Sequence, residues 1–165
     1  MLTESFPDLR YVIIGTQTDR GYVAVLRAIV EKANMTNLVL FRENVPEDVL
    51  LQWYGGAEAF VLSSVERNNA VEGFGMVYLE AGACGVPVVG CTETGAEDAV
   101  VDGQTGFLVS HDPTAIADAI RKILRDKNLA KRMGDAGRRW AETFDWDNVV
   151  SQYEKVIVSL LPLRQ

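Results

Sequence analysis

Two glutamates, Glu72 and Glu80, lie eight residues apart around a Gly-Phe-Gly turn in the stretch VEGFGMVYLEAGACGVPVV. Glycine reaches backbone angles that other residues avoid, and it lets a ligand approach the main chain closely. A carboxylate accepts hydrogen bonds on two adjacent oxygens, which matches the neighbouring hydroxyls of a ribose or a hexose. Two ordinary surface acids would show the same spacing, so the surrounding residues must decide between the two interpretations.

A helix is expected to begin directly after this turn. The backbone N–H groups of Gly75, Met76 and Val77 would then have no partners inside the helix. Together with the helix dipole, such groups suit a phosphate. The sequence therefore predicts a site for a sugar–phosphate–nucleoside, with Glu72 on the sugar, the helix start on the phosphate and Glu80 on the ribose.

The neighbours of Glu80 suggest that this helix is largely buried. They are apolar or small: Val77, Leu79, Ala81, Ala83 and Cys84. A buried carboxylate needs a partner. This expectation favours the binding-site interpretation over that of two surface acids.

Short apolar runs alternate with helical patterns along the chain. Strands are predicted at residues 10–15, 37–41, 59–64, 87–91 and 106–110. Helices are predicted at residues 19–33, 47–54, 76–83, 113–125, 128–143 and 146–161. The alternation predicts an α/β fold with a parallel sheet covered by helices on both faces, in a single domain over residues 1–165.

Ligands of such sheets bind beyond the carboxyl ends of the strands. The loops at that edge are predicted at residues 15–19, 42–44, 63–75 and 91–97. The turn between the two glutamates belongs to the third of these loops. The topology therefore places it where a ligand is expected.

The composition excludes several classes of protein. The 165 residues carry a formal net charge of -7, which argues against binding to a nucleic-acid backbone, although a local basic spot could still hold one small anion. Cys84 and Cys91 lack metal-ligand spacing and are interpreted as reduced core thiols. Reduced thiols are those expected of a cytoplasmic protein. No run reaches the roughly 18 apolar residues of a membrane span, and no signal peptide opens the chain.

Other familiar motifs are missing from the sequence. The loop GTQTDRG has the wrong spacing for a dinucleotide fingerprint, and no Walker motif, metal cluster or nucleophile elbow is found. The single histidine, His111, is expected in a solvated loop. The basic cluster KRMGDAGRR, residues 131–139, is expected to form a solvated helix face, with contact to anionic lipid heads as the alternative.

The segments EGFGMVYLEAGACGVPVV and DGQTGFLV resemble the donor-binding signature of group 1 retaining glycosyltransferases, which include glycogen-synthase-like and sucrose-synthase-like enzymes. The family pattern is Glu-Gly-Phe-Gly, four residues, Glu-Ala, and then Gly-x-Pro-Val. Weaker similarity covers nearly the whole chain. The resemblance implies one Rossmann-like half of a GT-B fold and transfer of a hexosyl group from a nucleotide-sugar to an acceptor hydroxyl with retention.

The resemblance also implies roles for particular residues. Glu72 would be the catalytic glutamate that contacts the transferred sugar, and Glu80 would bind the ribose hydroxyls. Arg42 would lie near the base. The remaining donor contacts would come from the turn and from the loop that follows the fourth strand: Gly73, Phe74, Gly75, Met76, Val77, Thr94 and Gly95. No cofactor or metal is implied, and the donor would be a UDP-, GDP- or ADP-sugar.

The sequence departs from the family pattern in three ways. Only the C-terminal, donor-binding half is expected, without the N-terminal acceptor domain. The first strand and helix of that half, which carry an Arg and a Lys for the diphosphate, are expected to be absent, and Arg20 is no substitute. That strand would be central, so either its neighbours close the gap or another chain fills it. The Gly-Gly-x-x-Glu loop reads ETGAED, with Thr94 at the first glycine and Asp98 at the glutamate.

Partners follow from these departures. A chain with half of the cleft would be inactive alone. The alternatives are a non-catalytic nucleotide-sugar binding module, a subunit of a split enzyme and a degenerate fragment. The acceptor would be a carbohydrate or a lipid-linked molecule. Peripheral contact of the protein with a membrane is the alternative to a purely cytoplasmic location. The last helix carries an apolar stripe, which predicts a homodimer or a complex with a separate N-terminal domain chain.

Overall fold

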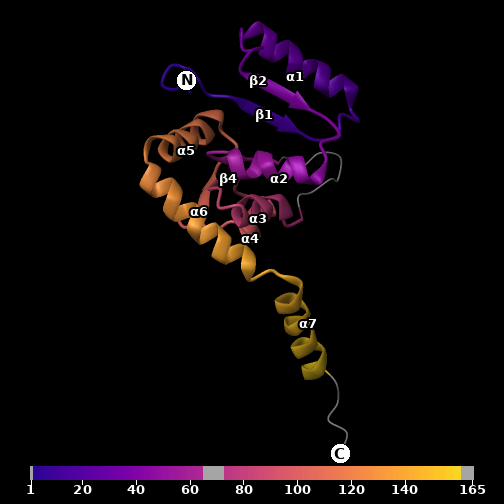
Figure 1. Ribbon diagram of the computed structural model, residues 1–165. Coiled ribbons are helices and arrows are strands. Elements are labelled where there is room, and N and C mark those ends of the chain that lie inside the picture. Colours follow the sequence, from indigo (N-terminus) through magenta and orange to yellow (C-terminus); the bar gives the residue numbers. More distant parts are fainter. Residues whose placement is uncertain (1, 65–72, 161–165) are drawn as a thin grey trace, which may run out of the picture. The chain divides into compact units, whose positions relative to one another are not determined.

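The computed structural model describes residues 2–64 and 73–160 and shows parallel strands alternating with helices (Figure 1). The predicted α/β class is confirmed. The elements, in chain order, are β1 (Tyr11–Ile14), α1 (Arg20–Lys32), β2 (Val39–Arg42), α2 (Glu47–Gly56), β3 (Phe60–Val61), α3 (Met76–Ala83), β4 (Val88–Cys91), α4 (Ala96–Ala99), β5 (Gly106–Val109), α5 (Pro113–Arg125), α6 (Lys127–Glu142) and α7 (Trp146–Leu160).

The chain divides into two compact units, Met1–Trp53 and Tyr54–Gln165. In the first unit, β1 and β2 pair in parallel, with Tyr11 opposite Val39 and Ile14 opposite Arg42. The side chain of Asp19 caps α1 by accepting a hydrogen bond from the Tyr22 backbone N–H at 2.9 Å. None of the residues 2–53 is fully buried, because two strands, one helix and the first part of α2 have too little surface to enclose a core.

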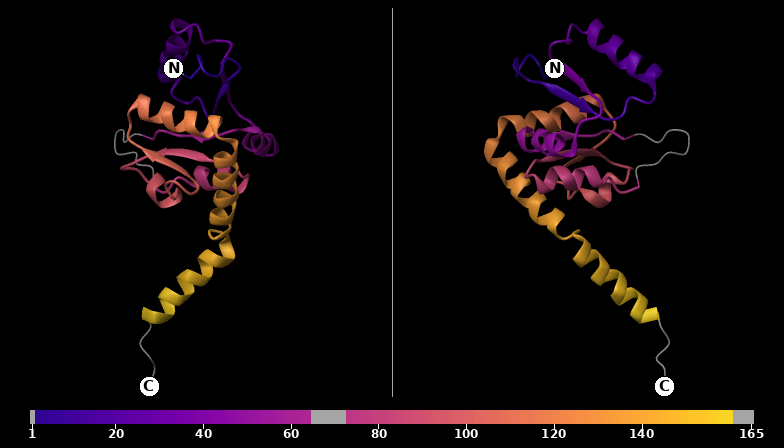
Figure 2. Two further views of the ribbon diagram at one scale, coloured as in Figure 1. Left: turned by 90° about the vertical axis from the view of Figure 1, so that its left-hand side faces the viewer. Right: turned by 45° about the vertical axis from the view of Figure 1, so that its right-hand side comes forward.

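The second unit has a real core around the parallel sheet β3-β4-β5. The central strand β4 is buried throughout, as expected for a strand covered on both faces. Helix α5 lies on one face of this sheet, and α3 and α4 lie on the other (Figure 2). Val89 points toward α5 and α6 and packs with Ala119, Ile123 and Met133, whereas its neighbour Gly90 lies against Tyr78 and Ala96.

Three details differ from the sequence-based expectations. The five strands form two sheets rather than one, and among the described residues β1 pairs with β2 alone while β3 pairs with β4 alone. Strand β3 is only two residues long, where 59–64 was expected. The loop after β4 contains a short helix, α4, that the sequence pattern did not predict.

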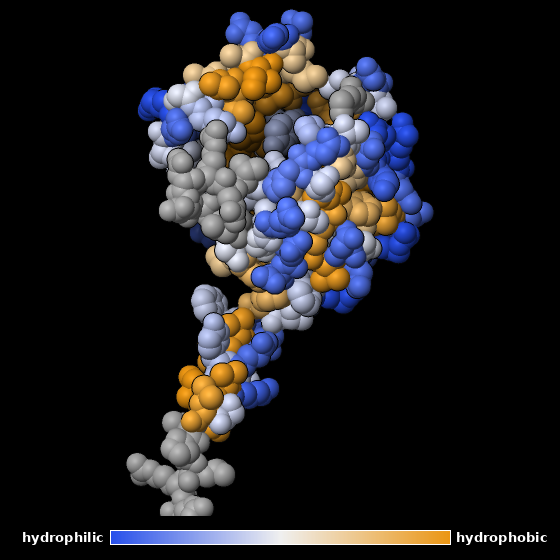
Figure 3. All heavy atoms as spheres, turned by 180° about the vertical axis from the view of Figure 1, so that it is seen from behind, coloured by the Kyte–Doolittle hydropathy of each residue, from blue (hydrophilic) through white to orange (hydrophobic). Residues whose placement is uncertain are grey.

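Helix α7 buries none of its residues. Large apolar side chains gather along it (Figure 3), and the most exposed are Trp146, Val158, Tyr153 and Leu160. Across residues 2–64 and 73–160, no helix combines the length and apolar character that a membrane crossing requires.

The two cysteines are free thiols, as expected. Cys91 is buried in β4, and this burial raises the pKa of its thiol. Cys84 is half-buried just after α3. His111 is exposed in the loop before α5, as the sequence predicted.

Candidate functional site

The start of α3 is an open helix N-terminus behind a glycine turn. Gly75 precedes the helix in the left-handed region, with φ 79° and ψ 55°, a conformation that costs a glycine little. No side chain of the described part of the chain caps the first turn. Within the described part of the chain, the N–H groups of Met76 and Val77 meet no acceptor, whereas that of Tyr78 donates to the Gly75 backbone oxygen at 2.9 Å. The first two groups and the dipole of this eight-residue helix suit an anion.

An aromatic cluster holds the turn from behind. The ring of Phe74 lies 5.3 Å from that of Phe144, and Phe144 meets Trp140 edge-on at 4.9 Å. Trp140 in turn donates from Nε1 to the backbone oxygen of Ala99 at 3.0 Å. The Phe74 side chain thus anchors the turn, which leaves the main chain of the turn as the part that can meet a ligand.

Helix α6 supports α3 through backbone contact. A Cβ added to Gly134 would lie 1.9 Å from the backbone oxygen of Gly85, and one added to Gly82 would lie 3.1 Å from that of Gly137. Glycine at these positions lets the two helices approach closely. Arg138 also donates from Nε to the Ala83 backbone oxygen at 3.1 Å, where a cation complements the helix C-terminus.

This support explains most of the basic cluster at residues 131–139. Met133, Gly134 and Gly137 are buried, so one side of the segment is a packing surface rather than a solvated face. Lys131 is exposed and pairs with Asp135 at 2.7 Å, which lowers the pKa of that carboxyl. The expectation of a solvated helix face therefore holds for the outer side of α6 only.

Glu80 is exposed, contrary to the expectation of a buried carboxylate. The buried face of α3 is formed by Tyr78, Ala81 and Gly82, and Glu80 lies outside it. It nevertheless has a partner, because the hydroxyl of Tyr54 donates to its Oε2 at 3.0 Å. Burial and this hydrogen bond raise the pKa of the Tyr54 phenol.

The loop after β4 is closed by its own side chains. Thr94 donates from Oγ1 to the Cys91 backbone oxygen at 2.8 Å and accepts from the Ala96 backbone N–H at 3.2 Å. Glu93 adopts a positive φ of 61°, and its backbone N–H donates to Glu97 Oε1 at 3.1 Å. The Thr94 hydroxyl therefore forms its hydrogen bonds within the loop. A ligand that bound at this loop would contact its main chain.

The structure brings part of the predicted site together. Gly73, Phe74, Gly75, Met76, Val77 and Glu80 form one continuous turn and helix start, and α4, which follows Thr94 and Gly95, packs against α3. Glu72 lies outside the described residues. Arg42 ends β2 in the other unit, is exposed and donates to the backbone oxygen of Phe41 at 3.2 Å. The donor-binding role of every one of these residues stays a prediction.

Sequence reasoning missed four supporting side chains: Tyr54, Arg138, Trp140 and Phe144. Trp140 lies near the end of α6 and Phe144 two residues beyond it, four residues apart in RRWAETFDW, a spacing at which two rings can meet across about one turn of chain. That spacing was a usable signal. No local pattern links Tyr54 to Glu80, since 26 residues separate them.

Comparisons with known proteins agree on one family. The family model for "Glycosyl transferases group 1" matches residues 1–140. A D-inositol 3-phosphate glycosyltransferase of Streptomyces avermitilis is 39% identical over 158 residues, covering 92% of this chain and 33% of that protein. A GDP-mannose-dependent alpha-(1-6)-phosphatidylinositol monomannoside mannosyltransferase of Mycolicibacterium smegmatis is 36% identical over 149 residues, covering 88% of this chain and 38% of that protein.

A solved structure shows the same architecture. The chain resembles sucrose-phosphate synthase from Thermosynechococcus elongatus with a TM-score of 0.81 and 27% identity, over 94% of this chain and 39% of that one. The chain thus spans about a third of the length of the relatives it matches.

Proposed function

Because the chain belongs to the group 1 glycosyltransferase family, we propose that it is the part of such an enzyme that binds the nucleotide-sugar donor. The observation that carries the proposal is the uncapped start of α3 behind the left-handed Gly75, with the carboxylate of Glu80 about one turn further on. This arrangement offers N–H groups to a diphosphate and an acceptor to hydroxyls. The reaction of the whole enzyme would transfer a hexosyl group to an acceptor hydroxyl with retention.

The proposed roles follow the chemistry of each group. The main chain from Gly73 to Val77 meets the sugar and its phosphate, and Glu80 accepts from the ribose hydroxyls. Glu72, as the catalytic residue, meets the transferred sugar. Thr94 and Gly95 add main-chain contacts, and Arg42 serves the base.

Donor binding is proposed to need neither a metal nor another cofactor. Backbone amides and the helix dipole would neutralise part of the diphosphate charge instead. The donor class is a UDP-, GDP- or ADP-sugar. The name of the Mycolicibacterium smegmatis relative specifies GDP-mannose, which makes this donor the first to test.

The chain is proposed to act as a donor-binding half that is inactive alone. The matched region is only about a third of each relative, so the acceptor side of the cleft would come from another domain. A carbohydrate or a lipid-linked molecule is the proposed acceptor. The exposed apolar stripe of α7 favours a second copy or a separate N-terminal domain chain as a protein partner.

Calorimetric titration of the chain with UDP, GDP and ADP, and with their sugars, tests the proposal. One nucleoside diphosphate should bind with a Kd below the millimolar range. Glu80→Ala should weaken it about tenfold to a hundredfold, because a hydrogen bond to a charged group is worth about 1.5–3 kcal/mol. Glu142→Ala, at an exposed glutamate at the end of α6, is the matched control and should bind as the wild type does.

A transfer and donor-hydrolysis assay on the same samples separates the enzyme half from its alternative. Binding without turnover, even after an N-terminal domain is supplied, would favour a non-catalytic nucleotide-sugar binding module. No binding below millimolar concentration, together with no effect of Glu80→Ala, would contradict the proposal.

A further inference from the structure

We propose that Tyr54 is a positioning residue of this site, which holds the Glu80 carboxylate in the orientation that receives a pair of neighbouring ribose hydroxyls. The inference rests on the proposed function, because it takes Glu80 as the ribose contact. It adds a side chain from a different helix, α2, to the recognition of the ribose.

The contact joins a buried phenol to an exposed carboxylate. Tyr54 is 8% exposed, and its hydroxyl donates to Glu80 Oε2 at 3.0 Å. Glu80 is itself exposed on α3. The buried Tyr54 hydroxyl therefore restricts the orientation of the exposed Glu80 carboxylate.

A chain of aromatic rings fixes the phenol in turn. The rings of Tyr54 and Phe60 lie 5.8 Å apart, and Phe60 meets Tyr78 edge-on at 5.6 Å. The Tyr78 hydroxyl donates to the Leu62 backbone oxygen at 2.7 Å, which anchors the row beside β3. The position of the Tyr54 hydroxyl is thus set by packing within the second unit.

The remaining acceptor capacity of Glu80 suits a diol. An ionised carboxylate has about four lone-pair sites on two oxygens. Tyr54 uses one site on Oε2, and no other residue of the described ranges donates to this carboxylate, so Oε1 and the rest of Oε2 can accept from ligand hydroxyls. A free glutamate on a helix surface would lose rotamer freedom when a ligand immobilised it, and Tyr54 removes much of that freedom beforehand.

The consequence is a preference for ribose over 2′-deoxyribose that depends on Tyr54. Only an oriented carboxylate accepts from both hydroxyls at once, and the 2′-deoxy ligand lacks one of them. Removing the phenol hydroxyl should therefore weaken the ribonucleotide more than its 2′-deoxy analogue. A purely structural role of Tyr54 would weaken both equally.

A double-mutant cycle on the full chain tests this inference. The proteins are the wild type, Tyr54→Phe, Glu80→Ala and the double variant, with Tyr153→Phe on α7 as the matched control. Each is titrated with UDP, GDP and ADP and with their 2′-deoxy forms. Tyr54→Phe should weaken the ribonucleotide about threefold to tenfold, as expected for one hydrogen bond, and should reduce the preference for ribose. The double variant should bind like Glu80→Ala, and Tyr153→Phe like the wild type.

The outcomes separate this inference from the proposed function. If Tyr54→Phe keeps the preference for ribose while Glu80→Ala loses it, the role of Tyr54 is overturned and the proposed function stands. A wild type that binds no nucleoside diphosphate would overturn both. Should Tyr54→Phe not fold, the wild type labelled with ¹³C in its tyrosine rings decides: the Tyr54 signal must move more with the ribonucleotide than with the 2′-deoxy form, and equal shifts would overturn the inference.

Discussion

We expect the Tyr54 phenol to make the free energy of unfolding depend on pH in the alkaline range. Its pKa in the folded chain is raised above the ordinary value of 10.0, first by burial and then by the hydrogen bond to Glu80. Above pH 10 the unfolded chain loses this proton while the folded chain keeps it, so the free energy of unfolding falls as pH rises. Urea unfolding between about pH 9 and pH 11 should show this decline, and Tyr54→Phe should make it shallower.

Glu80→Gln serves as the comparison for this titration. It removes the negative charge but keeps an acceptor for the phenol, so the decline should persist in weaker form because burial is the larger cause. If the free energy of unfolding fell equally steeply with pH in the wild type and in Tyr54→Phe, the assignment of this decline to Tyr54 would be contradicted.

Residue types predicted the turn and the helix after it, but not which residues are exposed. The predicted helix 76–83 matches α3. The prediction that Glu80 is buried was wrong because its immediate neighbours in the sequence point in other directions around the helix. The buried residues Tyr78, Ala81 and Gly82 follow the three- and four-residue spacing of one face, and Glu80 falls outside that face. A count of apolar neighbours does not reveal this orientation.

Among the elements, α6 sets the position of α3 by close backbone contact. Gly134→Ala would bring a methyl group to 1.9 Å from the Gly85 backbone oxygen, so the helices must separate. We expect a loss of about 1–3 kcal/mol in the free energy of unfolding, typical of overpacking. Chemical denaturation followed by circular dichroism measures it.

Gly55→Ala is the matched control for this substitution. Gly55 lies in α2 with nothing within 4 Å of an added Cβ, so the change should stabilise the chain by about 0.5–1 kcal/mol. Equal effects of the two substitutions would show that backbone contact does not hold α3 against α6.

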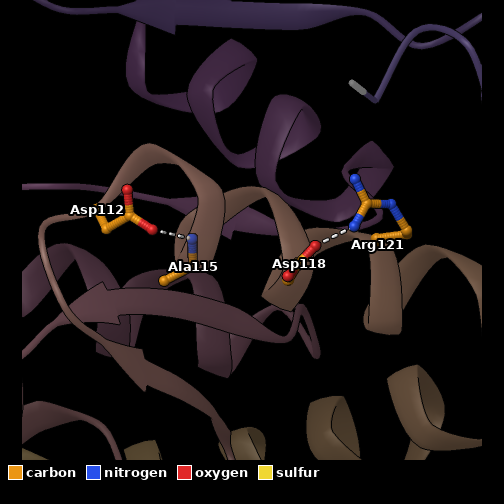
Figure 4. Close-up of polar contacts among 4 residues, drawn as sticks. All are labelled: Asp112, Ala115, Asp118 and Arg121. Carbon is orange, nitrogen blue, oxygen red and sulfur yellow. Dashed lines mark hydrogen bonds and ion pairs between the residues drawn. The ribbon is translucent and has the colours of Figure 1, made fainter.

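Helix α5 depends on its N-cap. Asp112 accepts through Oδ2 from the Ala115 backbone N–H at 3.0 Å (Figure 4). Pro113 follows in the first turn. Asp112→Ala should cost about 1 kcal/mol. Asp118→Ala breaks only the exposed contact with Arg121 seen in the same view and should cost less than about 0.5 kcal/mol. A larger effect of Asp118→Ala in thermal unfolding would contradict this ranking.

Element boundaries were more predictable than the contacts between elements. The expected α5 range, 113–125, matches the structure, since Asp112 and Pro113 are strong local start signals. The contacts of α6 with α3 depend on residues roughly fifty positions apart, such as Arg138 and Ala83. A single sequence carries no local signal for such contacts.

At the scale of the whole molecule, the apolar face of α7 should drive self-association. Its exposed residues include Val150, Val156 and Ile157. Sedimentation should show a species heavier than a monomer at high concentration, and Ile157→Glu should shift it toward the monomer because burying a charge in an apolar interface is costly. Gln152→Glu adds the same charge at a polar position of α7 and should leave association intact.

A clean monomer of the wild type at high concentration would contradict the homodimer. It would leave another protein as the candidate partner for this face.

The sequence predicted the α/β class and the parallel direction of the strands, but not their division into two sheets. Alternating strands and helices imply crossover connections and hence parallel pairing. They do not specify which strands become neighbours. The structure pairs β1 with β2 in one sheet and β4 with both β3 and β5 in the other, and only the second sheet encloses a buried core.

The central claim is that the start of α3 binds the diphosphate of a nucleotide-sugar. Nuclear magnetic resonance of the ¹⁵N-labelled chain, titrated with the nucleoside diphosphate that binds most tightly, tests it most directly. The backbone amides of Gly75, Met76 and Val77 should shift most, because their N–H groups would donate to the phosphates. Saturable shifts confined to other parts of the chain, with these three amides unmoved, would contradict the account.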